Sequence, residues 1–471
     1  MIGLDPQHEE LFRLVSDAAG RIKQPVYVVG GYVRDYYLNR LHLKEQPDID
    51  FVTVGSGIAL AEEVARALET DHLSVFKQFG TAHIRWNGID LEFVGARRES
   101  YQRDSRKPIV EDGTLEDDQR RRDFTINALS WSLNSENYGA LLDPFGGVQD
   151  MRNRIIRTPL DPQETFDDDP LRMMRAARFS TQLGFDIEEK TLEAMQTMAD
   201  RLQIISQERI TDELNKIAAA PMPSTGFRIL FETGLLQQFF PELCDLHGVK
   251  VINNIRHKDN FWHTLEVLDN VARVSDKLWL RWAAIMHDIA KPPTQRFVPG
   301  TGWTFHGHDA LGASWTKRIF ARLCLPLDER MKYVRKLVRL HLRPIALVSE
   351  EVTDSAIRRL LFEAGEDIDD LMTLCRADIT SKNDAKVKRF LRNFDHVTER
   401  MKEVEAQDKL RNWQPPVRGD EIMEKLGLKA GPDVGKIKKA IEEAILDGEI
   451  PNEYEAALSY MYRIKDQVLR Q

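Results

Sequence analysis

The sequence predicts an α+β protein with a mixed α/β head at its N-terminus and helices in the remainder. Short strand-like segments such as VYVVGG, IDFVTVG, TAHIRW and IDLEFV lie between Val26 and Trp131, with one helical segment, GIALAEEVARALET, among them. Beyond Asp143, apolar residues recur at helical spacing in long amphipathic stretches. A chain of 471 residues, 42% of them hydrophobic, is long enough for roughly three or four globular units.

Composition excludes several classes of protein. The N-terminal MIGLDPQHEELFRLV lacks the basic and apolar regions of a signal peptide, and no apolar run reaches membrane-spanning length, so we expect a cytoplasmic protein that does not enter a membrane. Cys244, Cys324 and Cys375 are far apart and form no C-x-x-C pair, which argues against a disulfide framework or a zinc ribbon. The net charge is −9, yet arginines cluster locally and could bind a polyanion.

The first functional candidate is a pair of glycines, Gly30 and Gly31, between a strand and the helical YVRDYYLNR. Glycines let backbone N–H groups approach an anion at a helix N-terminus, so the position suits a phosphate. The following residues do not continue as G-x-G-x-x-G, which excludes a dinucleotide-binding loop. An ordinary tight turn is the alternative interpretation.

The second candidate is the pair Asp48 and Asp50 in DIDFVTV. The period of a strand puts both carboxylates on one face, while the apolar residues between and after them point into a core. Paired carboxylates favour divalent cations that activate a hydroxyl and bind a triphosphate, so they indicate metal-dependent phosphoryl chemistry. A polar strand entrance is the alternative, and Asp90 or Glu92 could supply a third carboxylate.

A third constellation lies in the helical half. A lone histidine in a helix is usually structural, but an adjacent His-Asp pair with further histidines nearby favours a transition metal that activates water. His306 competes for one position with His308, and we choose the latter because GHDALGA resembles the corresponding motif of HD-domain proteins more closely. The predicted ligands are His263, His287, Asp288, His308, His341 and Asp378.

Two resemblances follow from these motifs. GGYVRD, DID, RRDFTINAL, DPFGG, DDPLRMMRAARF and ERITDEL resemble, in order and spacing, class II tRNA nucleotidyltransferases, the bacterial CCA-adding enzymes and poly(A) polymerases of the DNA polymerase β superfamily. The histidine set resembles an HD-domain phosphohydrolase, with Ala290 where glycine is common. Together they imply a nucleotidyltransferase head over 1–140, a helical neck and body over 141–245, an HD domain over 246–385 and a helical, RNA-binding tail over 386–471.

The resemblance implies roles for the head residues. Asp48 and Asp50 would hold Mg²⁺, and Gly30, Gly31 and Arg34 would bind the incoming nucleotide. In the RRDF motif the resemblance implies contacts to the triphosphate and the ribose 2′-hydroxyl, where an aspartate that accepts from this hydroxyl would favour ribonucleotides. The residues concerned are Arg122 and Asp123, and a surface ion pair between them is the alternative.

In DDPLRMMRAARF, Asp169 and Arg172 lie three apart, and we expect them on one helix face. The aspartate can accept from an exocyclic amine and the arginine can donate to the adjacent ring nitrogen, a pattern that cytosine and adenine share and that uracil and guanine reverse. Alternatively, Asp169 simply caps the helix. Arg175 and Arg178 would continue the face toward phosphates.

These features predict addition of CMP, CMP and AMP from CTP and ATP to the tRNA 3′ end. A poly(A) polymerase is the alternative within the family, but Phe79-Gly80-Thr81 resembles the CCA-adding form, and the ARRESYQRDSRKP segment speaks against an enzyme that stops after CC. The HD site, with a divalent transition metal, could hydrolyse phosphate esters or 2′,3′-cyclic phosphates. A third reading, an HD hydrolase with an RNA-binding head, requires lost head residues, and none is missing.

Overall fold

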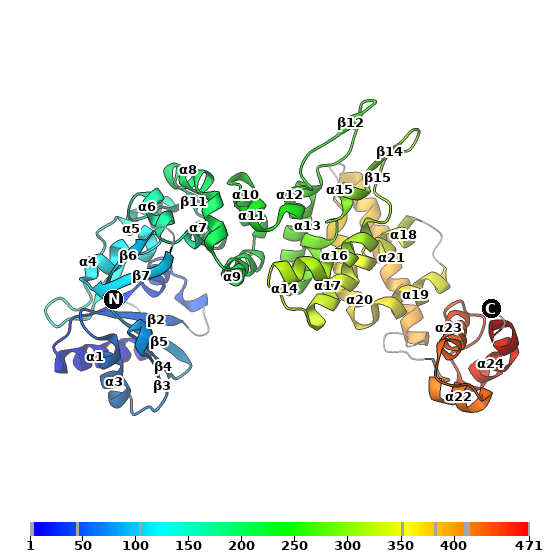
Figure 1. Cartoon of the computed structure of the whole chain (residues 1–471), viewed down its shortest axis with the longest axis horizontal. Coiled ribbons are helices and arrows are strands. Elements are labelled where there is room, and N and C mark those ends of the chain that lie inside the picture. Colours follow the sequence, from blue (N-terminus) through cyan, green and yellow to red (C-terminus); the bar gives the residue numbers. More distant parts are fainter. Residues whose placement is uncertain are drawn as a thin grey trace. The chain divides into compact units, whose positions relative to one another are not determined.

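A computed structural model describes residues 4–43, 47–102, 105–349, 353–380, 384–408 and 415–469 (Figure 1). The chain forms two compact units. The first comprises Met1–Ile217 and Thr225–Phe239, and the second comprises Ala218–Ser224 and Phe240–Gln471. The chain therefore passes between the units three times.

A seven-stranded sheet forms the base of the first unit. Its strand order is β3-β4-β5-β2-β1-β8-β9, and every neighbouring pair is antiparallel except β2 and β5, which run parallel. The strands span β1 Val26–Val29, β2 Asp48–Thr53, β3 Leu73–Phe76, β4 Thr81–Trp86, β5 Ile89–Gly95, β8 Ser130–Ser132 and β9 Leu141–Leu142.

Helices α1 (Pro6–Arg21) and α3 (Gly57–Ala67) pack against each other and against this sheet. Phe12 of α1 meets the ring of Phe51 edge to face, and Phe51 stacks on Phe93 of β5 with 5.0 Å between centroids. All three rings are fully buried. Because Phe51 points into this core, strand alternation turns Asp50 to the opposite face.

Short helices and a hairpin complete the sheet region. The hairpin comprises β6 (Arg97–Gln102) and β7 (Ser105–Asp112); it contains most of the predicted 96–108 segment, of which 103 and 104 lie outside the described residues. The remaining elements that lie wholly in the first unit are α2 Gly31–Tyr37, η1 Leu41–Leu43, η2 Lys77–Phe79, α4 Leu115–Arg120, η3 Thr125–Asn127, α5 Gly147–Asn153, β10 Ile155–Ile156, α6 Pro162–Asp168, α7 Leu171–Leu183, β11 Asp186–Ile187, α8 Glu189–Thr197, η4 Ala199–Ile204 and α11 Leu235–Phe239.

Two helices lie where the chain changes units, α9 (Gln207–Ala218) and α10 (Pro223–Glu232). Gly226 of α10 explains part of the packing in the first unit. A Cβ atom at this position would lie 2.5 Å from Ile217 Cγ2 and from Thr181 Oγ1. Only a glycine allows this close approach without displacement of its neighbours.

The second unit is helical apart from two hairpins. Its helices are α12 Pro241–Cys244, α13 Asn260–Ala272, α14 Leu278–Met286, α15 Lys291–Thr294, α16 His308–Arg322, α17 Glu329–Leu340, α18 Leu342–Ser349, α19 Asp354–Ala364, η5 Gly365–Asp367, α20 Ile368–Asp378, α21 Asp384–Asp408, α22 Gly419–Leu426, α23 Pro432–Leu446 and α24 Tyr454–Leu469. The hairpins are β12 (Val251–Ile252) with β13 (Ile255–Arg256), and β14 (Arg296–Val298) with β15 (Gly302–Thr304).

The predicted fold class is confirmed, with one refinement. The part after the head is not wholly helical, because β10 pairs with β11 and the two hairpins interrupt the helices of the second unit. Helices α22, α23 and α24 enclose a small core of their own around Ile437, Ile441 and Met461. Among the described residues, no helix has both the length and the apolar character needed to cross a bilayer.

Candidate active sites

The register between β2 and β5 aligns the carboxylates of the head. Asp48 lies opposite Asp90, and Asp50 lies opposite Glu92. Asp90 lies 3.6 Å from His83 Nε2, whereas Glu92 is close enough to Asp50 to act on its charge. The parallel pairing of β2 with β5 thus places four acidic residues next to one another as two cross-strand pairs.

Asp50 has an altered acidity. Burial raises the pKa of Asp50 to about 6, and the negative charges of Glu92, Asp48 and Asp118 act in the same direction, while the guanidinium of Arg122 opposes them. A carboxylate that its neighbours disfavour as an anion gains when a divalent cation binds next to it. The residues therefore fit Mg²⁺, with Asp48 and Asp50 as its candidate ligands.

A pocket of about 420 Å³ lies beside Asp50. Ten of the eleven predicted head residues line it, and only Asp48 is not among them. Seven arginines and three aspartates give the pocket an excess of positive charge, which suits a triphosphate. The lining residues are Gly30, Gly31, Arg34, Asp50, Arg121, Arg122, Asp123, Asn127, Asp169, Arg172, Arg175, Arg178, Phe179 and Arg209.

The glycine turn brings the backbone close to an arginine. Gly30 adopts a φ of 74°, and a Cβ atom there would lie 2.9 Å from Arg122 Nη1. Arg122 in turn donates to Asp118 Oδ2 from Nε and Nη2, at 3.0 and 2.9 Å. The ion pair predicted as an alternative, between Arg122 and its neighbour Asp123, is absent from the described contacts, because Arg122 pairs with Asp118 instead.

Asp123 is the centre of a buried hydrogen-bond network. Its carboxylate accepts from Asn127 Nδ2 at 2.9 Å and from Arg175 Nε at 2.7 Å. Burial on its own would raise the pKa of Asp123, but the charge of Arg175 and these hydrogen bonds outweigh it and lower the pKa to about 2. Asn127 also accepts from Arg34 Nη1 at 2.7 Å, so one amide connects two predicted nucleotide-binding residues.

The base-selecting pair differs in detail from the prediction. Helix α7 begins at Leu171, so Asp169 precedes the helix and does not share its face with Arg172. Pro170, and not Asp169, is the N-cap residue of α7. Asp169 Oδ1 still accepts from the backbone N–H of Leu171 at 3.1 Å, while Oδ2 pairs with Arg209 at 3.2 Å. Both side chains nevertheless line the same pocket.

Two arginines of α7 and one of α2 lie around the aromatic ring of Phe179. The guanidinium carbons of Arg178, Arg34 and Arg175 lie 4.0, 5.1 and 5.7 Å from the ring centroid of Phe179. Arg178 also forms an ion pair with Glu213 of α9. Arg172 is buried and donates to the carbonyl oxygens of Thr165 and Arg121. These contacts restrict the arginines before any ligand binds.

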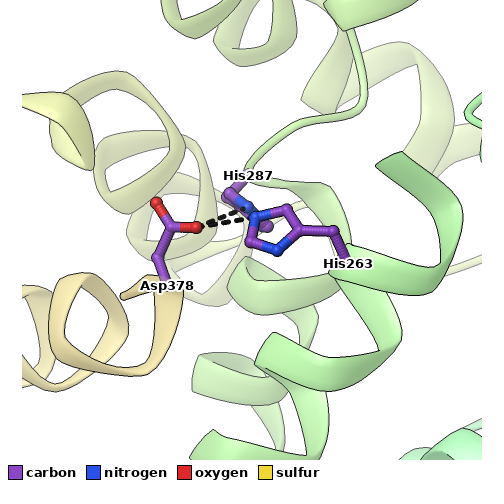
Figure 2. Close-up of side chains that lie close together, drawn as sticks. All are labelled: His263, His287 and Asp378. Atoms are coloured by element: carbon purple, nitrogen blue, oxygen red, sulfur yellow. Dashed lines mark ion pairs between the residues drawn. The ribbon is translucent and has the colours of Figure 1, made fainter. Parts of the chain in front are cut away.

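The six predicted metal ligands of the second unit form two adjacent groups. His263, His287 and Asp378 make one group and Asp288, His308 and His341 make the other, and within each group the ligand atoms lie within 4.8 Å of one another. In Figure 2 one carboxylate oxygen of Asp378 faces the imidazoles of both His263 and His287. This oxygen, Oδ1, lies 2.8 Å from His263 Nε2 and 3.7 Å from His287 Nε2. His306 is exposed and lies outside both groups.

Backbone carbonyls orient three of these imidazoles. Nδ1 of His287, His308 and His341 lies 2.7 Å from the carbonyl oxygens of residues 284, 305 and 338, respectively. If each Nδ1 carries the hydrogen that this contact needs, Nε2 keeps its lone pair and faces the cluster. Nε2 of His287 is buried without a hydrogen-bond partner of good geometry in the described chain, as expected of a metal ligand.

Charge in the cluster is strongly coupled. Burial would lower the pKa of His287, but Asp288 and Asp378 outweigh it and raise the pKa to about 10. Burial and the charge of His287 lower the pKa of His341 to about 4. The pKa of Asp288 and that of Asp378 stay well below the usual range because imidazoles outweigh their burial. Nitrogen and oxygen donors in this mixture fit a divalent transition metal.

Comparisons with known families assign the head and the histidine cluster to different domains. Residues 26–157 match the poly A polymerase head domain, residues 184–246 match the probable RNA and SrmB-binding site of polymerase A, and residues 260–382 match the HD domain.

Two relatives decide the family. The A-adding tRNA nucleotidyltransferase of Deinococcus radiodurans is 35% identical over 351 residues, 73% of this chain and 78% of that protein. The CC-adding tRNA nucleotidyltransferase of Thermus thermophilus is 31% identical over 450 residues, 93% of each chain. The chain belongs to the tRNA nucleotidyltransferase family. The predictions of the family and of an enzyme are thereby confirmed.

A solved structure supports the fold of this tRNA nucleotidyltransferase. The CCA-adding enzyme of Bacillus stearothermophilus in complex with CTP has a TM-score of 0.65 and 24% identity, and the similarity covers 99% of this chain and 100% of that chain. At this identity the likeness supports the fold and not the details of the site.

Sequence reasoning missed several residues of both centres. Asn127 stands in the RRDFTINAL motif and could have been considered from it, whereas Arg209 approaches Asp169 from 40 residues away. In the second unit, Lys258 and Thr380 contact His263 Nδ1, each at 3.0 Å. No local pattern identifies these last contacts.

Proposed function

We propose that this tRNA nucleotidyltransferase adds the complete CCA sequence, using CTP and ATP, to the 3′ end of tRNA in the cytoplasm. The observation that carries the proposal is the convergence of ten motif residues on one arginine-rich pocket beside Asp50. Addition of A alone or CC alone and poly(A) synthesis are the alternatives within the family. Phe79-Gly80-Thr81 and the hairpin over 97–112 favour complete addition.

In the proposed reaction, the 3′-hydroxyl of tRNA attacks the α-phosphate of the nucleotide and pyrophosphate leaves. Asp48 and Asp50 are the residues that would hold Mg²⁺, which when bound supplies charge neutralisation and hydroxyl activation. Arg34 and Arg122 bind and orient the triphosphate. Asp123, kept ionised by Arg175, accepts a hydrogen bond from the ribose 2′-hydroxyl.

Base selection is assigned to Asp169 and Arg172. Their donors and acceptors complement the amine and bare ring nitrogen of cytosine and adenine, so one protein pair serves both nucleotides. In the free protein these side chains contact Arg209, Thr165 and the backbone near Arg121. Selection therefore requires that both side chains exchange these contacts for the base.

A second activity is proposed for the histidine cluster. The buried Nε2 of His287, which makes no well-aligned hydrogen bond in the described chain, and the orientation of three imidazoles support binding of a divalent transition metal. A metal bound by such donors activates water, which suits hydrolysis of phosphate monoesters or 2′,3′-cyclic phosphates. The four-part division at 140, 245 and 385 remains our proposal for how these functions are distributed along the chain.

Single-nucleotide sizing of products tests the main proposal. The purified protein with Mg²⁺ and a tRNA that ends at its discriminator base receives CTP, ATP or both. We expect two cytidines with CTP alone and a stop after CCA with both nucleotides. A long A-tail would identify a poly(A) polymerase, addition of CC or A alone would identify a divided pathway, and no extension would leave only the HD chemistry.

A further inference from the structure

A pocket of about 770 Å³ lies next to the histidine cluster of the second unit. It is bounded by the region of β12 and β13 and by the first turns of α13. His263 lines this pocket and also belongs to the cluster. A molecule bound there would therefore reach the reacting centre proposed above. We call it the hairpin pocket.

One wall of the hairpin pocket is the β12–β13 hairpin, and the β14–β15 hairpin contacts it from outside the pocket; both hairpins project from the helical body in Figure 1. Trp303 Nε1 of β15 donates to the carbonyl oxygen of Ile255 in β13 at 2.9 Å. The ring of His257 packs edge to face on Trp303, with 5.3 Å between centroids. These contacts hold β13 in place, so the wall is a defined surface.

An aromatic ring and two cations line this pocket. Trp262 is 39% exposed, although it precedes the buried His263 in α13. The Arg256 side chain forms no hydrogen bond or ion pair with any described residue, so its guanidinium is available to an anion. Lys258 lines the same pocket and contacts His263 of the cluster. Aromatic faces next to cations are typical of sites that bind nucleotides.

The two carboxylates of the pocket have other partners. Asp259 caps α13 by accepting from the backbone N–H of Phe261 and also accepts from Gly248 N. Glu266 lies 3.8 Å from Lys258 Nζ at the other side. Arg256 is thus the cation of the pocket without a partner in the described part of the chain.

The position of Lys258 depends on the state of His263. In the free protein Lys258 Nζ lies 3.0 Å from His263 Nδ1, and Lys258 also contacts Thr380 Oγ1. A neutral imidazole has one acceptor nitrogen, so an Nε2 that ligates a metal leaves the proton on Nδ1. Nδ1 then donates to Thr380 Oγ1, and Lys258 loses His263 as an acceptor while it can still donate to Thr380 Oγ1. Because an ammonium group has three donors, Lys258 then has donors left for an anion in the pocket.

We propose that the hairpin pocket binds a nucleoside that carries a 3′-, 2′- or cyclic phosphate, with the base stacked on Trp262 and the phosphate on Lys258 beside the cluster. Arg256 binds a neighbouring phosphate when one is present. The proposal rests on the proposed hydrolase function of the cluster. The ligand is either a free nucleotide or the terminal nucleotide of an RNA, and these two differ by the additional phosphates of the RNA.

Calorimetric binding to the full chain tests the pocket independently of hydrolysis. The titrations use Mn²⁺-loaded protein whose head is saturated with a non-hydrolysable ATP analogue. The probes are inorganic phosphate, 3′-AMP and a short RNA with a 3′-phosphate. We expect Trp262→Ala to weaken the affinity for 3′-AMP by about tenfold or more, because base stacking is lost, and to leave the affinity for inorganic phosphate unchanged. Trp262→Phe, which keeps an aromatic face, should retain most of the affinity.

A second pair of variants separates the two sources of ligand. If the pocket binds RNA ends, Arg256→Ala should weaken the affinity for the RNA more than that for 3′-AMP. If the pocket binds free nucleotides, Arg256→Ala should change neither affinity. Arg296→Ala removes another exposed arginine, on β14 outside the pocket, and should change no affinity. Circular dichroism and the amount of bound Mn²⁺ report whether the second unit of each variant is folded.

The outcomes distinguish the pocket from the hydrolase. Trp262-dependent binding of 3′-AMP without hydrolysis of 2′,3′-cyclic AMP by the wild type would keep the pocket and remove the proposed hydrolase. Hydrolysis of 2′,3′-cyclic AMP by the wild type, together with unchanged 3′-AMP affinity in Trp262→Ala, would keep the proposed hydrolase and remove the pocket. No binding of 3′-AMP by the wild type, or equal losses for phosphate and 3′-AMP, would also overturn the pocket.

Discussion

The two candidate metal centres of this tRNA nucleotidyltransferase differ in how their surroundings shift the pKa of a carboxylate. In the head, strand register aligns carboxylates, and their burial and mutual repulsion raise the pKa of Asp50 to about 6. In the second unit, helix ends bring imidazoles around carboxylates, and the pKa of Asp288 and that of Asp378 fall. Protons therefore compete with a metal ion at the Asp50 carboxylate in the head and at the His287 imidazole in the cluster.

This comparison teaches how each centre distinguishes its cation. Oxygen donors from carboxylates suit Mg²⁺, which keeps part of its water shell, and the arginines of the head pocket bind the phosphates instead of the metal. Imidazoles with fixed tautomers suit transition metals. The two centres use no common residue, so the comparison predicts that either centre can be inactivated while the other stays active.

The largest expected effect is that of Asp50→Ala on nucleotide addition. Loss of a candidate metal ligand beside the pocket should reduce addition by at least about 100-fold, the scale of a lost electrostatic contact to the transition state. Hydrolysis by the cluster should not change. Product sizing and a phosphate-release assay measure the two activities, and Glu62→Ala on the exposed face of α3 is the control.

The reciprocal change is His287→Ala. It should abolish hydrolysis and lower the amount of bound transition metal, which elemental analysis measures, because it removes a buried imidazole whose Nε2 faces the carboxylates of Asp288 and Asp378 in the cluster. Nucleotide addition should remain within about twofold, as usual for a change distant from a reacting group. A single variant that loses both activities would show that the centres are not independent.

Arg172→Ala should change nucleotide choice more than tRNA affinity. Discrimination against UTP and GTP should fall roughly 10- to 100-fold, because an unsatisfied buried polar group costs about 1–3 kcal/mol. Competition assays with the four nucleotides measure this ratio, and gel-shift titration measures tRNA binding. Arg120→Ala, an exposed arginine of α4, is the control. Unchanged selectivity would contradict the assignment of base selection to this residue.

The smallest effect concerns pH. A raised pKa of about 6 means that Asp50 gains a proton as pH falls through 6, and the proton competes with Mg²⁺. Lowering the pH from 7.5 to 5.5 should raise the Mg²⁺ concentration for half-maximal addition about fourfold, from the fraction of Asp50 that is protonated. An unchanged Mg²⁺ requirement would show that another group controls binding.

The sequence was informative where chemistry depends on local spacing. Strand alternation explains why Asp50 faces the pocket while Phe51 faces the core, and the ordered motifs brought ten residues to one pocket. The start of α7 was misjudged because Asp169 and Pro170 precede the helix and the N–H of Leu171 bonds to the Asp169 carboxylate. Helix boundaries depend on such capping contacts, which periodicity does not reveal.

Contacts between distant segments could not be predicted. The register of the parallel pairing between β2 and β5 places Glu92, and not Asp90, opposite Asp50, and this register is set by the three-dimensional sheet. Thr380 reaches His263 across 117 residues, and Arg209 reaches Asp169 across 40. Such pairs depend on how helices pack in three dimensions, on which a single sequence carries no direct signal.

The threefold passage of the chain between its units has a consequence for dissection of the protein into fragments. A fragment that ends at Ile217 would omit Thr225–Phe239, which belongs to the same unit and contributes the buried Leu230 and Leu236. It would also lose Gly226, whose close approach to Thr181 admits no larger residue without displacement. A truncation that aims to isolate nucleotide addition should therefore extend at least through Phe239.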